Sequence, residues 1–269
     1  MSLRKFIVAS PIVILTIVAS AWFWLLHTES GARFIWNRTT EALGGALQAA
    51  EIRGDLGSGL ALERITYRHE DMHATVKRFQ ASVDIDLLTL SVEIKDVRVN
   101  STRLQIESSD DKNQTSANVE DILDNLNLPF DIIVSGFVAN DVVLDGIVDD
   151  RSIVITDARF DTVTWDEAIR VSSLAVSAPE GNAQASARLE LQPPYAVSLN
   201  GSIAAAPEFV GLRDAVIEFD GNGNVSSLNL TTVEIKGQDL RLTGDAQLNL
   251  RHDFALASRI QLQHLNGNA

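Results

Sequence analysis

The chain of 269 residues contains no cysteine. Without a thiol it can form neither a disulfide framework nor a thiolate metal site, and it has no cysteine nucleophile. Aromatic residues are also scarce, at 6% of the sequence, whereas leucine, isoleucine and valine dominate the apolar residues. This composition is typical of a strand-rich protein that is stabilised by side-chain burial and backbone ladders.

Positive charge is in short supply as well. The chain has 22 Lys and Arg against 36 Asp and Glu, which gives a net charge of −14. Proteins that bind nucleic acid neutralise its phosphates with clustered Lys and Arg, so this balance argues against a nucleic-acid partner.

One long stretch lacks charge altogether, because residues 6–26 follow Arg4 and Lys5 without a single charged side chain. A hydrocarbon core of about 30 Å needs roughly 20 apolar residues in a helix, and positive flanks stay in the cytoplasm. Residues 1–28 are therefore predicted to be a transmembrane signal anchor. It would hold a single-pass protein in a Gram-negative inner membrane, with the bulk of the chain in the periplasm. Its membrane-anchor positions are predicted to be Ile7, Ile12, Leu15, Val18, Trp22 and Trp24.

A cleaved signal peptide is the alternative, since Ala19-Ser20-Ala21 has the small-residue spacing that signal peptidase accepts. The apolar region of a signal peptide usually has ~7 to 15 residues. Here the apolar run continues past that site through Trp22 and Trp24 into an aromatic belt. We therefore expect the anchor to be retained.

The period of the apolar residues changes from about 3.6 to 2 after residue 51. Residues 29–51 are predicted to form a short helix, capped by Ser30, and a linker. Residues 52–269 are predicted to form a periplasmic β-groove domain of short antiparallel strands. A second amphipathic helix is predicted over residues 118–128, where Pro129 stops it.

One or two short helices are too few to cover the apolar face of about a dozen strands, and a closed sandwich core usually contains more bulky aromatics. We therefore expect a mainly β fold, an elongated curved antiparallel sheet whose inner face forms a groove that is open to acyl chains. A closed β-sandwich is the alternative.

The apolar residues of the strands occupy alternate positions. Where they switch from even to odd positions, or back, we predict a turn or a bulge. The inward, lipid-binding residues are predicted to be Val83, Ile85, Leu90, Val92, Ile94, Val97, Val99, Leu104 and Ile106.

Two motifs invite other interpretations. His69-Glu70-Asp71-Met72-His73 matches the zincin pattern H-E-x-x-H, which needs both histidines on one face of a helix. The flanking segments alternate like strands, so a hairpin turn is predicted instead. A hairpin is also predicted at residues 220–224, where the start of a calcium loop lacks its later Gly and Glu. We expect no catalytic residue, metal or cofactor.

Four segments follow the predicted anchor in a characteristic order: residues 52–67 (IRGDLGSGLALERITY), 83–88 (VDIDLL), 92–97 (VEIKDV) and 126–132 (LNLPFDI). In this order they resemble the amino-terminal region of the TamB family, of the AsmA-like superfamily. The resemblance implies an inner-membrane-anchored periplasmic protein with a long β-sheet folded into a taco-like groove. This groove would conduct phospholipids towards the outer membrane and support outer-membrane biogenesis. From its motifs, the protein is not expected to be an enzyme.

The resemblance also implies a partner, a TamA-like outer-membrane barrel of the Omp85 type, bound through the far C-terminal region of the family. The sequence has nothing that corresponds to that region, so either a fragment or a truncated member is expected, and partner docking is not carried over. The alternative function is a scaffold or chaperone for outer-membrane protein assembly. Such a scaffold would offer a sheet edge to unfolded strands by β-augmentation.

The uncharged run predicts that the protein stays in the inner-membrane fraction after an alkaline carbonate wash, because a spanning helix is not released with peripheral proteins. Immunoblots of the washed membranes and the supernatant measure this directly. A soluble product that begins at Trp22 would show that the segment is a cleaved signal peptide.

Overall fold

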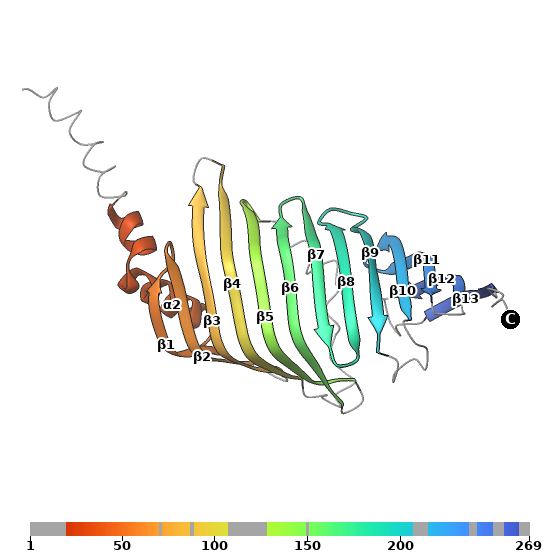
Figure 1. Cartoon of the computed structure of the whole chain (residues 1–269). Coiled ribbons are helices and arrows are strands. Elements are labelled where there is room, and N and C mark those ends of the chain that lie inside the picture. Colours follow the sequence, from red (N-terminus) through yellow and green to blue (C-terminus); the bar gives the residue numbers. More distant parts are fainter. Residues whose placement is uncertain are drawn as a thin grey trace, which may run out of the picture.

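The structure is a computed structural model that describes residues 20–69, 72–86, 89–106, 128–148, 151–206, 215–236, 241–249 and 256–263. These residues form one sheet of 13 strands in chain order, with helix α2 (Glu29–Ala42) at the β1 end (Figure 1). The strands are β1 (Leu47–Asp55), β2 (Gly59–His69), β3 (Met72–Asp86), β4 (Ser91–Ile106), β5 (Asp131–Val148), β6 (Arg151–Trp165), β7 (Ala168–Ala178), β8 (Gly181–Glu190), β9 (Ala196–Ala205), β10 (Val216–Asn224), β11 (Ser227–Lys236), β12 (Arg241–Asn249) and β13 (Leu256–Gln263).

The expected mainly β fold is confirmed, and Figure 1 shows the strands side by side along one elongated, curved sheet. Neighbouring strands are antiparallel except β4 and β5, which run parallel with Leu104 opposite Leu144. The expectation of a purely antiparallel sheet is wrong at this pair. A parallel pair needs a connection of a dozen or more residues, and residues 107–130 supply that length.

Helix α2 begins and ends earlier than the sequence predicted. Thr28, and not Ser30, is its N-cap, because Thr28 Oγ1 accepts a hydrogen bond from the Gly31 N–H at 3.0 Å. The helix stops before Gly44 and Gly45, whose φ values of 61° and 82° lie in the left-handed region that favours glycine. Strand β1 therefore starts at Leu47, inside the segment that was predicted to be helix and linker.

Residues 20–27 are helical and lead into α2. Within the part of the chain that the structure describes, no helix is long and apolar enough to cross a membrane. The predicted anchor positions Ile7, Ile12, Leu15 and Val18 lie outside that part. The predicted second helix also lies outside it, apart from its last residue, Leu128.

The changes of parity fall inside continuous strands. In β4 the apolar alternation passes from Ile94 to Val97, and Asp96 between them has a φ of 53°. A left-handed residue adds one position to the strand, as in a β-bulge, and so exchanges the two sides of the alternation. Ser101, with a φ of 52°, makes the second exchange before Leu104.

The left-handed residues lie at matching levels of β4 and β5. Gly136 has a φ of 66°, and a Cβ placed on it would lie 3.7 Å from the Asp96 nitrogen. Asp141, with a φ of 55°, is level with Ser101 in the same way. Because both strands change parity at the same levels, their register is preserved and one side of the sheet stays apolar.

Asp96→Val is expected to lower the free energy of unfolding by about 1–3 kcal/mol, since a β-branched residue is strained at a positive φ. Arg98→Val is the matched control. Arg98 lies on the same strand, its side chain is exposed, and its φ is not positive. The Arg98→Val variant should therefore change the free energy of unfolding by less than about 0.5 kcal/mol. Urea unfolding followed by circular dichroism measures both variants. Equal effects would contradict a left-handed backbone at residue 96.

Candidate functional site

An apolar surface runs from strand to strand on one side of the sheet, which we call the apolar face. In β4, Val92 lies opposite Ile85 of β3 and Ile132 of β5, while Ile94 lies opposite Val83 and Val134. Opposite residues of paired strands share a face, so these rows extend across the sheet. One row consists of Ile85, Val92, Ile132, Trp165, Ile169, Leu189, Val197, Gly223 and Leu228.

The described chain covers little of this face. Within the described ranges no large side chain is fully buried, and most residues of the apolar face are only half-buried. Val97 is among the better buried, at 6% exposure, whereas Ile203 keeps 39%. A second layer of protein would bury such residues almost completely. The face is therefore the surface of a single layer, partly shielded by neighbours within the sheet.

Helical residues cover one end of the apolar face, at β1 to β3. The Gly57 N–H donates to the Leu26 carbonyl at 2.9 Å, and the Val83 N–H donates to the Leu56 carbonyl at 2.6 Å. Gly57 allows this approach, because a Cβ there would lie 2.5 Å from the His27 ring. The resulting helical cluster joins side chains of the helices, of the β1–β2 turn and of the sheet: Trp22, Leu26, Ala32, Ile35, Leu56, Leu60, Val83 and Ile85.

The turn that receives the helix is held by Asp55. Its carboxylate accepts hydrogen bonds from the hydroxyl and the N–H of Ser58, and these bonds lower the pKa of Asp55 below its ordinary value. A carboxyl with a lowered pKa adds stability that is complete above about pH 4 and is lost as the pH falls through the lowered value. At neutral pH the turn keeps its full stabilisation.

Most of the predicted lipid-binding residues lie together on the apolar face. The predicted residues that pair with apolar partners across β3, β4 and β5 are Val83, Ile85, Val92, Ile94, Val99 and Leu104. Val97 lies between Ile94 and Val99 and is buried. Ile106 ends β4 opposite Met72, but its side chain lies outside the described residues. Val83 and Ile85 are partly covered by the helical cluster.

Leu90 lies apart from the strand rows that contain the other predicted residues. It lies before the first residue of β4, with a φ of 53° and a side chain that is 59% exposed. The left-handed conformation takes it out of the extended alternation on which the prediction was based.

The sequence analysis missed residues that the register adds to the same face. Phe79 lies opposite Leu62 and Val99, and Phe137 stacks on Phe160 with 4.6 Å between the ring centroids. Their alternation within each strand was a usable signal. The side on which they lie became clear only with the strand pairing.

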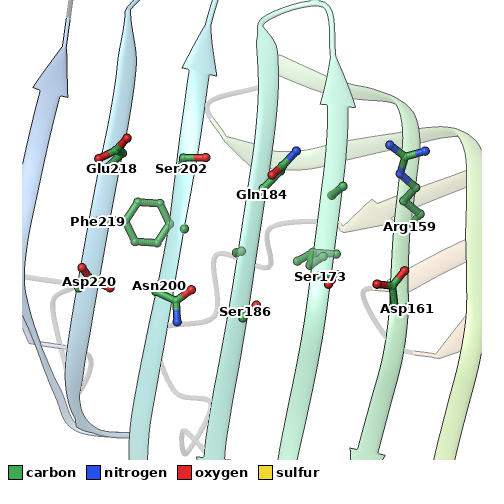
Figure 2. Close-up of a pocket in the computed structure, with 14 residues that line it drawn as sticks. Arg159, Asp161, Ser173, Gln184, Ser186, Asn200, Ser202, Glu218, Phe219 and Asp220 are labelled. Atoms are coloured by element: carbon green, nitrogen blue, oxygen red, sulfur yellow. The ribbon is translucent and has the colours of Figure 1, made fainter.

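The opposite side of the sheet is the polar face. Between β6 and β10 it is hollowed to a volume of about 810 Å³, and Figure 2 shows its polar side chains in successive strands. Arg159, Asp161 and Glu218 are among its lining residues, and Glu218 also pairs with Lys236 Nζ at 2.6 Å. None of the predicted lipid-binding residues lines this hollow.

The two histidines of the H-E-x-x-H motif lie in strands. His69 ends β2 opposite Met72, which begins β3, so the predicted hairpin is confirmed and the helix that a zincin site needs is not formed. His73 Nε2 accepts a hydrogen bond from Arg68 Nε at 3.2 Å. Among the described residues no cluster of histidine and carboxylate side chains is placed to hold a metal ion.

The hairpin predicted at residues 220–224 is displaced. These residues belong to β10, and the turn follows at Val225 and Ser226. Asn224 Oδ1 accepts hydrogen bonds from the N–H groups of Ser226 and Ser227, at 2.9 and 3.0 Å. The glycines there serve the sheet: a Cβ on Gly221 would lie 2.8 Å from the Leu230 side chain.

Among the described residues, one layer of strands with a continuous and largely uncovered apolar face defines an elongated class of β protein. Residues 17–145 match the family model described as TamB, N-terminal domain. They are therefore a TamB-like N-terminal region, as the resemblance predicted, and indicate a TamB-family role in outer-membrane assembly in a Gram-negative envelope. Searches of curated proteins and of solved structures found no match.

Replacing His69 and His73 together by alanine is expected to leave function and metal content unchanged, because the histidines lie in a strand hairpin and His73 is bonded to Arg68. Metal analysis of the purified protein and a growth assay of the variant test this. One zinc ion per chain that disappears in the double variant would restore the metalloenzyme interpretation.

Proposed function

We propose that the chain is an inner-membrane-anchored periplasmic protein whose apolar face conducts phospholipids towards the outer membrane. The observation that supports this most strongly is the continuity of the apolar rows across the strands. An ordinary core needs apolar residues only where another layer covers them. Here the apolar residues continue from strand to strand along the sheet. The described chain covers these residues in two places, at the β1 end of the sheet and near β7 to β9.

The chemistry of the face suits a conduit. Burial of an acyl chain gives roughly 25 cal/mol per Å² of apolar surface, whichever head group the lipid has. The rows are built mainly of Val, Ile, Leu, Ala and aromatic residues, so binding depends on contact area and not on fixed hydrogen bonds. A lipid can then shift along the sheet without breaking specific interactions. No catalytic step is needed, and we propose that the protein is not an enzyme.

We propose that the helical cluster is the entry point of the lipid path. Trp22 and Leu26 belong to the C-terminal end of the predicted membrane anchor and share one cluster with the sheet residues Val83 and Ile85. Apolar surface therefore extends from the helix to the first strands of the apolar face. In this proposal phospholipid leaves the inner membrane along the helix and enters the groove at β3.

The scaffold function, including a TamA-like barrel as partner, is the second candidate. It requires a sheet edge with free backbone groups. At β1 this edge is partly occupied, because α2 lies against the strand and Arg33 Nη2 donates to the Ile52 carbonyl at 3.4 Å. A scaffold would therefore use the β13 edge. A free edge alone does not require the uninterrupted apolar face, so the conduit is the better supported function.

A photo-crosslinking amino acid at Val92 or Leu104 is expected to capture phospholipid in cells, since both residues lie on the apolar face. The same probe at Glu93 or Gln105, one residue further on the polar face, should not. Mass spectrometry of the crosslinked chain identifies the lipid. Equal capture at all four positions would indicate unspecific contact with the membrane.

Ile94→Asp extends this test, because it places a carboxylate in the proposed acyl path at a cost of several kcal/mol if the site stays dry. Lipid transfer to the outer membrane should fail, while circular dichroism still reports the sheet. Gln105→Asp, on the polar face, adds the same charge and should transfer lipid normally. If Ile94→Asp simply unfolds and no apolar position captures lipid, the face is a closed core and the conduit proposal is wrong.

A further inference from the structure

The polar face bears a cluster of cations, although the whole chain has a net charge of −14. Arg64 of β2 and Lys77 of β3 lie at the same level of the sheet, and Ser101 of β4 continues this level. They surround a hollow of about 390 Å³. We call it the cationic hollow, and its lining residues are Glu63, Arg64, Lys77, Arg78, Asn100 and Ser101.

The cationic hollow is lined by three cationic side chains and one carboxylate. Glu63 is its single carboxylate, and Glu63 Oε1 lies 3.8 Å from Arg78 Nη2, a loose contact between partly exposed side chains. Arg64 and Lys77 have no ion-pair or hydrogen-bond partner among the described residues. Other cations of the sheet have a close carboxylate partner, as Arg188 has in Glu190 at 2.6 Å.

The neutral lining residues add hydrogen-bond donors. Asn100 Oδ1 accepts a hydrogen bond from Asn140 Nδ2 at 3.2 Å, and the Asn100 Nδ2 group remains as a further donor. Ser101 contributes a hydroxyl. Guanidinium, ammonium, amide and hydroxyl donors that converge on one hollow match the oxygen atoms of a phosphate, which accepts hydrogen bonds and is negatively charged.

The backbone is also unusual at this point. Arg64 and Ser101, on either side of Lys77, have φ values of 50° and 52°. Left-handed conformations are strained for these residue types and often occur at functional sites. The three residues lie on paired strands, so their spacing is set by the sheet and is present before any ligand arrives.

We propose that the cationic hollow binds a phosphate group, of the kind found both in phospholipid head groups and in free phosphate. Arg78 and Asn100 lie opposite each other on the polar face, whereas the neighbouring Phe79 and Val99 lie opposite each other on the apolar face. The phosphate site is therefore on the side of the sheet away from the acyl path. It does not depend on the conduit function.

Titration of the full-length protein with inorganic phosphate and with glycerol 3-phosphate, followed by phosphorus NMR, tests the proposal. Saturable binding is expected, and Arg64→Gln together with Lys77→Gln should raise Kd at least tenfold. The matched control is Arg188→Gln with Lys236→Gln, which removes two cations that are already paired with carboxylates and should change Kd less than twofold. Circular dichroism checks that both double variants keep the sheet.

The two probes also separate the sources of phosphate. Tighter binding of glycerol 3-phosphate points to a lipid head group, and tighter binding of inorganic phosphate points to the free ion; either result supports the site. Asn100→Asp provides a second route, because it replaces a donor with a negative charge without altering the cations, and it should also weaken binding tenfold. No saturable binding, or equal weakening in the control, would show that the hollow is an ordinary solvated surface.

Discussion

The whole structure depends on one constraint, that every strand must turn its apolar side to the same face of the sheet. Side chains alternate with a period of two, so a shift of a single residue in one strand would send its apolar side chains to the opposite side. The left-handed residues in β4 and β5 change the parity at matching levels, and the pairs Ile94–Val134 and Leu104–Leu144 both remain on the apolar face. Without this match the apolar rows would be interrupted at β5.

Much of the local structure could be predicted from the alternation alone. The sheet, the hairpin at His69 and most of the inward residues of β3 and β4 followed from it, because parity is a local property of each strand. The parallel pairing of β4 with β5 could not be predicted, since it depends on a partner that lies beyond residues 107–130. The position of Leu90 outside the strand rows could not be predicted either, because its left-handed backbone is set by the turn and its side chain gives no sign of it.

The apolar face and the cationic hollow could be predicted only in part, because both depend on partners that are distant in the sequence. The sequence indicates which residues of one strand share a side, but the rows of the apolar face and the cationic hollow arise from register between strands. Arg64, Lys77 and Ser101 are separated by up to 37 positions in the chain and come together at one level of the sheet. The contact of Val83 with the helical cluster is equally non-local.

The two sides of the sheet differ in chemistry, and the central proposal concerns the apolar one: we propose that acyl chains cover the apolar face. The most direct test is to purify the chain under mild conditions and to measure bound phospholipid by mass spectrometry. The account predicts more than one phospholipid per chain, with head groups in the proportions of the source membrane, because the rows contact acyl chains by area. A folded chain that carries no phospholipid would contradict it.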